Sequence, residues 1–308
     1  MENADTKTNK DGVLMANTEL KVKDLFDEFI VSKTIQNLSD RTISYYKENL
    51  GYFFRFKQVE YINDYTKLDV ANYIMLLKNS NVTDNTINTR LRAVKVFFKY
   101  IESEYSLVLP KIKLLKTSTK CKQIHSIDNL KKLLEEPNFN NFVQYRNWIM
   151  IQVMLSTGGR LSSIQNLKIS DIDFNDAYIN YEHSKNGESY SVPLDSHIKD
   201  SLKAFIDTLP STAEYVFCTK QGKQLTTISI QSSIKRYCES KGLDKGYCYT
   251  HILRRQFATN IAKETKDYIL LQKLLAHKTP YMSMHYVNIT NNDAKEAIDR
   301  YSIFNKLN

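Results

Sequence analysis

The chain has 308 residues, enough for two ordinary domains, and its 42% of hydrophobic residues can fill their cores, which excludes an intrinsically disordered protein. Gly (8) and Pro (5) are scarce, which disfavours loop-rich β architectures. Lys and Arg (43) outnumber Asp and Glu (34), and the excess is shared, with 20 basic and 15 acidic groups in residues 1–124 and 23 and 19 in residues 125–308. This balance favours a polyanion contacted along the whole molecule, although many soluble proteins are as basic.

The sequence predicts no secretory, membrane or metal-binding segment. The start of the chain lacks the apolar core of a signal peptide, and the most apolar stretch, Trp148 to Leu155, is too short to span a bilayer. The four cysteines form no Cys-x-x-Cys pair and show no zinc spacing with the six histidines. We therefore expect a cytoplasmic protein with reduced thiols and no bound metal.

Residues 17–109 predict four amphipathic helices that form a compact bundle. Expected N-caps are Asn17 or Thr18, Ser39, Thr66 and Thr83, and Thr66 forms a capping box with Asp69. The fourth helix carries basic residues away from its apolar stripe, at Arg90, Arg92, Lys95 and Lys99. These residues form either a nucleic-acid contact or an ordinary solvated face.

Residues 110–124 predict a basic linker between two domains. Pro110 is followed by lysines separated by Ser and Thr, at Lys111, Lys113, Lys116, Lys120 and Lys122. We expect residues 1–16 to be a flexible N-terminus, and residues 125–308 to form the second domain.

The second domain reads as helices around a small β-hairpin. Ser126 caps a helix over 127–135, and residues 142–156 form a strongly apolar helix. Residues 177–183 and 189–194 predict two strands around the Asn-Gly turn of residues 184–187. Helices dominate from residue 227 onward, so the predicted fold class is mostly α.

Three segments carry residues suited to phosphate chemistry. Thr157-Gly-Gly-Arg160 places an arginine at a helix start, where it could grip a phosphate or simply cap the helix. Thr250 is the expected cap of a helix with His251 and Arg254 on one face, although such a pair is common by chance.

The third segment ends at a tyrosine. His277 ends an apolar helix begun near Asp267, and Thr279-Pro280 starts a short helix that presents Tyr286. A phenol needs nearby cations before it can attack a phosphate. With 20 tyrosines in the chain, packing is the ordinary role of any one of them.

Taken in chain order, six residues resemble the tyrosine recombinase (phage integrase) family in spacing and context: Arg160, Lys185, His251, Arg254, His277 and Tyr286. Thr157 to Arg160 matches its Thr-Gly-x-Arg, and Lys185 precedes Val-Pro-Leu (192–194). His251 to Arg254 precedes Phe-Ala-Thr (257–259), and His277 lies nine positions before Tyr286. The likeness covers essentially the whole chain. It implies a simple two-domain core-site enzyme with an N-terminal SAM-like core-binding bundle and a mainly helical catalytic domain.

Three positions depart from the family pattern. The Glu usual three residues after the first Arg is Ser163 here, so a supporting interaction is lost or replaced. Leu-Gly-His is Leu275-Ala276-His277, and Arg255 stands where the family often has His. Because none of the six chemical positions is missing, we expect an active enzyme.

The resemblance implies a metal-free and ATP-free reaction with no cofactor. Tyr286 would attack the scissile DNA phosphate and form a 3′-phosphotyrosyl link, while Arg160 and Arg254 hold its non-bridging oxygens. Lys185 would protonate the departing 5′-oxygen, His251 would assist proton transfer at the nucleophile, and His277 would donate a hydrogen bond to the phosphate.

The implied partner is double-stranded DNA, recombined through a Holliday junction by a homo-tetramer in a prokaryotic cytoplasm or on its nucleoid. A C-terminal helix at about residues 292–304 would join the protomers, or would pack on its own domain. Residues expected to contact DNA are the linker lysines and Arg41, Lys47, Arg90, Arg92 and Lys95. Integration, excision and resolution, and a need for accessory DNA-bending factors, remain open.

Two alternatives share the same residues. A type IB topoisomerase uses a similar set to relax DNA, but the compact N-terminal bundle favours a recombinase. A catalytically inactive DNA-binding relative would bind DNA without forming a covalent adduct.

Overall fold

The structure is a computed structural model that describes residues 20–117, 124–181, 189–284, 286 and 295. The chain divides into two compact units, residues 1–120 and 121–308, and the described residues form twelve α-helices and one three-stranded sheet. The predicted fold class, mostly α with a small hairpin, is confirmed. None of the described helices is long and apolar enough to cross a membrane.

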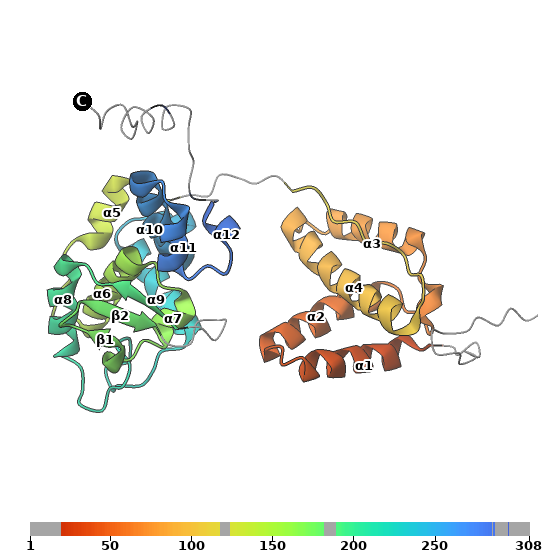
Figure 1. Cartoon of the computed structure of the whole chain (residues 1–308), viewed down its shortest axis with the longest axis horizontal. Helices are drawn as coiled ribbons and strands as arrows, with labels where there is room; N and C mark the ends of the chain where they lie inside the picture. The colour runs from red at the N-terminus through yellow and green to blue at the C-terminus, as the bar shows by residue number, and fades with distance from the viewer. Residues whose placement is uncertain (1–19, 118–123, 182–188, 285, 287–294, 296–308) are drawn as a thin grey trace, which may run out of the picture. The chain divides into compact units, whose positions relative to one another are not determined.

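The first unit is a bundle of four helices (Figure 1): α1 (Val22–Ile35), α2 (Asp40–Phe56), α3 (Lys67–Asn79) and α4 (Asp84–Tyr105). Helix α4 packs against the other three. The core is rich in phenylalanine, and Phe29, Phe53 and Phe97 are completely buried. Phe29 and Phe97 meet edge to face with ring centroids 5.4 Å apart, a favoured aromatic geometry.

Side-chain caps start three of these helices as predicted. Ser39 and Thr83 accept hydrogen bonds from the main-chain N–H groups of Thr42 and Thr86 at 3.3 and 3.2 Å. Helix α1 differs, because its N-cap position is Lys21, whose side chain makes no capping bond. The predicted caps Asn17 and Thr18 lie outside the described residues.

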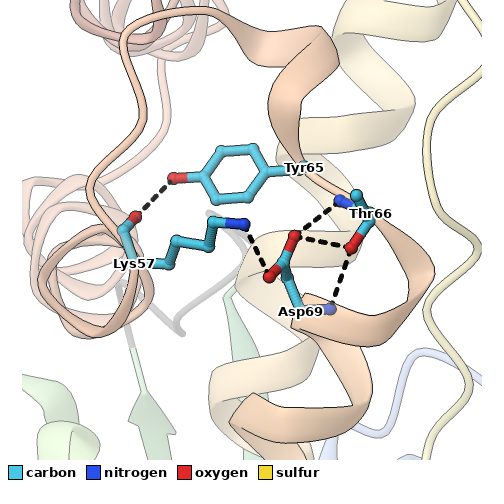
Figure 2. A network of polar contacts seen from close by, with 4 residues as sticks. All are labelled: Lys57, Tyr65, Thr66 and Asp69. Carbon is cyan, nitrogen blue, oxygen red and sulfur yellow. Dashed lines mark hydrogen bonds and ion pairs between the residues drawn. The ribbon is translucent and has the colours of Figure 1, made fainter.

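Helix α3 starts at the predicted capping box, which a lysine from the end of α2 extends (Figure 2). Asp69 accepts from the N–H of Thr66 at 2.8 Å and from Lys57 Nζ at 2.7 Å. Tyr65 donates its hydroxyl to the Lys57 carbonyl. Hydrogen bonds from Lys57 and then Thr66 lower the pKa of Asp69 to about 2, so the carboxylate stays charged and holds α3 to the C-terminal end of α2.

The second unit is built around α6 (Phe142–Thr157), a helix buried on nearly every side that packs against α5, α8, α9 and α10. The other helices are α5 (Ile127–Leu134), α7 (Leu161–Gln165), α8 (Ser196–Ile206), α9 (Thr227–Ser240), α10 (Thr250–Thr265), α11 (Tyr268–Leu275) and α12 (Pro280–Met284). The antiparallel sheet has the order β1 (Ile172–Asp173), β2 (Tyr178–Tyr181), β3 (Tyr190–Pro193).

The predicted strand pair is β2–β3, in which Tyr181 lies opposite Tyr190. Strand β1 and helix α8 were not predicted. Helix α8 did leave a signal, because Asp195 caps it and its buried residues Ile198, Leu202 and Phe205 follow helical spacing. The predicted turn at residues 184–187 lies outside the described residues.

One predicted cap is wrong. Thr250 is the first residue of α10 rather than its cap, and Tyr249 occupies the cap position without a side-chain bond. The reason is that Thr250 is buried within the first turn of the helix. Ser126 caps α5 as predicted and accepts from the N–H of Asn129.

A buried histidine makes the stability of the second unit sensitive to acid. His125 is 3% exposed, neither ring nitrogen has a partner, and its ring packs on Tyr247. Burial lowers the pKa of His125 to about 4, against about 6.5 when unfolded. The neutral ring is therefore tolerated above pH 6.5, and the fold loses stability as the pH falls toward 4.

Replacing this ring with an apolar one should weaken the acid sensitivity. Between pH 7 and pH 5, we expect His125→Phe to lose about 2 kcal/mol less unfolding free energy than the wild type, since the unfolded state gains no proton there. Fluorescence of Trp148, the one tryptophan of the chain, reports unfolding of this unit by denaturant. Identical pH dependence in both proteins would contradict this account.

Candidate active site

The site is built on the turn that ends α6. Gly158 adopts a left-handed conformation (φ 62°), and a Cβ there would lie 2.4 Å from Phe257 Cδ1. Only glycine fits this close approach of α6 to α10. The Thr157 hydroxyl accepts from the N–H of Gly159 at 3.2 Å, which fixes the turn that leads to Arg160.

Arg160 follows this turn at the N-cap position of α7. Its Nη2 donates to the carbonyl of Ala276 at 2.6 Å. Its Nη1 is buried and has no hydrogen-bond partner among the described residues. A buried guanidinium nitrogen without an acceptor is costly, so this nitrogen is a ready donor for an anion.

Arg254 lies beside Arg160, in the second turn of α10. Its Nη1 donates to the carbonyl of Gly158, and its Nη2 donates to the carbonyl of Leu275 at 2.9 Å. Burial, followed by the charge of Arg160, lowers the pKa of Arg254 to about 10, so both side chains remain charged at neutral pH. Each terminal nitrogen carries two hydrogens, so Arg254 can donate further bonds.

The C-terminal end of α11 holds both arginines. The helix stops at Ala276, which is left-handed (φ 46°), and the exposed carbonyls of Leu275 and Ala276 each accept one guanidinium. The last carbonyls of a helix carry partial negative charge and need donors. The two arginines supply those donors, so the end of α11 and the start of the site are one structure.

His277 follows directly and is 8% exposed. Its Nδ1 lies 2.8 Å from the hydroxyl of Ser283, which is fully buried in α12. Burial, then the charges of Arg254 and Arg160, lower the pKa of His277 to about 4. The imidazole is therefore neutral at physiological pH.

Tyr286 stands next to these groups. Its ring is roughly parallel to that of His277, with centroids 6.3 Å apart, and it packs against the cluster of Phe257, Ala258, Ala262, Leu271 and Leu275. The phenol lies close enough to Arg254 to favour its charged form and so oppose the lowering of its pKa. One short segment thus carries both the histidine and the tyrosine to the arginines.

His251 is exposed on the first turn of α10. Partial burial of its ring, then the charges of Arg254 and Arg255, lower its pKa, so the neutral form dominates at pH 7. Lys185 lies outside the described residues, within the segment 182–188 that joins β2 to β3. The contacts therefore link Arg160, Arg254, His277 and Tyr286, with His251 on the same helix as Arg254.

Two site residues were missed from the sequence. Tyr190, in β3, donates its hydroxyl to Ser163 at 3.4 Å and also acts on Arg254. Ser283 was missed as the partner of His277, although its position inside a short helix before Tyr286 could have indicated it. Nothing local in the sequence marks Tyr190.

The basic residues predicted to meet DNA lie on α2 and α4 of the first unit: Arg41, Lys47, Arg90, Arg92 and Lys95. All but the half-buried Arg90 are exposed. Arg90 and Arg55 both lie against the ring of Tyr52, at 4.1 and 4.9 Å from its centroid. This stack was missed because it joins two helices.

The predicted linker is described in part. Lys111, Lys113 and Lys116 are exposed. Lys120 and Lys122 lie outside the described residues. In the part of the chain that the structure describes, no group of three or more His, Cys, Asp or Glu residues could hold a metal ion.

Comparison with known proteins matches both units. The sequence model of the phage integrase family matches residues 125–293, and that of the phage integrase N-terminal SAM-like domain matches residues 25–106. Tyrosine recombinase XerC of Oceanobacillus iheyensis is 25% identical over 287 residues, which cover 89% of this chain and 93% of the relative. Tyrosine recombinase XerA of Pyrococcus horikoshii is 23% identical and covers 94% and 97% of the two chains.

Solved structures show the same fold. A Tn1549 transposon integrase in complex with a circular intermediate DNA superposes with a TM-score of 0.78, at 17% identity over 91% of this chain and 99% of that one. A lambda integrase from a tetramer bound to a Holliday junction gives 0.73, at 16% identity over 89% and 79%.

Proposed function

This chain belongs to the phage integrase family and is a tyrosine recombinase, an enzyme that cleaves and rejoins DNA at specific sites, and we propose that Tyr286 is its nucleophile. The observation that carries this assignment is the convergence of Tyr286 with Arg160 and Arg254. Their carbonyl contacts fix two cations side by side, and a backbone phosphate is the anion of DNA that matches them.

In the proposed mechanism, the phosphate binds between the two guanidiniums. Arg160 Nη1, which has no acceptor among the described residues, would donate to one non-bridging oxygen, and the remaining hydrogens of Arg254 would serve the other. Because both groups are held before DNA arrives, they stabilise the charge that develops in the transition state without reorganising.

Tyr286 would then attack the phosphorus in line and displace the 5′-oxygen, leaving a 3′-phosphotyrosyl link. The neutral His277 can hold its hydrogen on Nε2 if Ser283 donates its hydroxyl to Nδ1, and this Nε2–H would bond the phosphate. We assign proton transfer at the nucleophile to His251 and protonation of the departing 5′-oxygen to Lys185.

The covalent link keeps the energy of the broken phosphodiester. Attack by a 5′-hydroxyl from a second site therefore rejoins strands without ATP and leads to a Holliday junction. This reversibility separates strand exchange from hydrolysis.

Tyr286→Phe should abolish covalent capture of DNA. We expect the wild type to form a protein–DNA adduct that survives denaturation and the variant to form none, because no other hydroxyl lies on the two arginines in the same way. The assay uses a nicked or suicide DNA site resolved on a denaturing gel. An adduct of undiminished yield in the variant would show that another residue is the nucleophile.

Arginine variants provide the control for binding. Arg160→Ala and Arg254→Ala should retain most DNA affinity, because many lysines share that load, yet lose cleavage by a factor of about a hundred or more. A loss of affinity as large as the loss of cleavage would contradict the proposed division between binding and chemistry.

We propose that the basic face of α2 and α4 grips the DNA backbone, and that the linker lysines add to it. The stack of Arg55, Tyr52 and Arg90 would present two ordered guanidiniums. Arg90→Ala should weaken binding several-fold and reduce the slope of log affinity against log salt by about 1, the change expected when one phosphate contact is lost. An unchanged slope in a gel-shift titration at several salt concentrations would remove Arg90 from the interface.

We also propose that residues 292–308 join protomers into a tetramer, since recombination exchanges strands between two sites. Only residue 295 of this segment is described. Deleting residues 292–308 should spare binding to a single site and abolish the assembly of two sites, measured by native gel shift. Normal recombination by the truncated chain would refute the proposal; a dependence on added DNA-bending protein would appear in the same assay.

A further inference from the structure

The sequence pattern leaves one place in the site without its usual carboxylate. Position 163 holds serine, and Ser163 is 1% exposed inside α7, three residues after Arg160. The side chain that reaches it is Tyr190, whose Oη donates to Ser163 Oγ at 3.4 Å. A residue of the hairpin is thus directed at the helix that begins with the first arginine.

The same phenol serves the second arginine. Burial and the charge of Arg160 lower the pKa of Arg254, whereas Tyr190 opposes this shift by its charge and by a hydrogen bond to the guanidinium. A phenol has one hydrogen to donate and an oxygen that can accept. Arg254 can therefore donate to Tyr190 while Tyr190 donates to Ser163, a chain of bonds that runs in one direction.

The ring of Tyr190 is held in place independently of these bonds. It packs on Tyr181, which lies opposite it in the β2–β3 pair, with centroids 5.0 Å apart. The hydroxyl of Tyr181 lies 2.8 Å from that of Thr157, in the turn that leads to Arg160. The base of the hairpin is thereby fixed to both arginine-bearing elements.

The charge of the site makes a neutral partner important. None of the ion pairs among the described residues involves Arg160 or Arg254, and no acidic side chain contributes to the pKa of Arg254. A carboxylate at this place would cancel part of the positive charge that a phosphate needs. A phenol orients the guanidinium and leaves its charge available.

We propose that Tyr190, together with Ser163, is a positioning residue that orients Arg254 in place of an acid, which keeps the full charge of both arginines for the scissile phosphate. This inference rests on the proposed function of the site. Tyr190 acts through Arg254 and does not itself touch the reacting atoms.

The test removes the hydroxyl and keeps the ring. Tyr190→Phe preserves the packing on Tyr181, and we expect it to slow single-turnover adduct formation about tenfold, because a displaced guanidinium loses alignment with the transition state. DNA affinity and the unfolding midpoint should stay at wild-type values. The matched control is Tyr178→Phe, an exposed hairpin tyrosine whose hydroxyl makes no printed contact in the described part of the chain, and its rate should not change.

A double-variant cycle separates positioning from general loosening. Ser163→Ala should also slow adduct formation, and the Tyr190→Phe/Ser163→Ala protein should be no slower than the slower single variant, because both changes break one chain of bonds. A wild-type rate in Tyr190→Phe, or fully multiplicative effects in the double variant, would overturn the inference while leaving Tyr286 as nucleophile. Absence of any adduct with the wild type would overturn both proposals.

Discussion

The structure of the active site depends on hydrogen bonds between two buried guanidiniums and three main-chain carbonyls. Arg254 bonds the carbonyls of Gly158 and Leu275, and Arg160 bonds that of Ala276. Two cations at close range repel each other, and the partial charges at the end of α11 offset that repulsion. These contacts require α6, α10 and α11 to pack as they do, and they leave the pair with a capacity for one more anion.

The same contacts explain how the nucleophile reaches the site. The chain continues from the carbonyls of α11 through His277 to α12, and the bond between His277 and Ser283 fixes that connection. Tyr286 comes three residues later and packs on the apolar cluster that includes Phe257 and Leu275. Binding and chemistry are thus coupled, because the elements that orient the cations also carry the phenol.

The parts of the site that the sequence could reveal are local. Residue type and spacing identified Arg160 after its glycines, Arg254 with His251, and Tyr286 after His277, and side-chain caps such as Ser39 could be read within a few positions. Tyr190 could not be found in this way, because its partners lie on α7 and α10, far away in the chain. The Tyr52 stack joins α2 to α4 and was hidden for the same reason. Thr250 misled because a threonine before a helix resembles a cap until burial places it in the first turn.

Ala276 shows how this chain tolerates a departure from the pattern it resembles. A left-handed alanine costs about 1–2 kcal/mol relative to a right-handed conformation, and glycine would carry no such cost. The turn persists because hydrogen bonds on both sides define it: Arg160 binds the carbonyl of Ala276, and the N–H of His277 donates to Gln272. The strain lies at the residue whose carbonyl faces the first arginine, so the energy that holds the arginine is the same energy that holds the backbone in its unfavourable conformation. A phosphate that binds Arg160 therefore acts on a turn already constrained by the protein, which is what preorganisation requires.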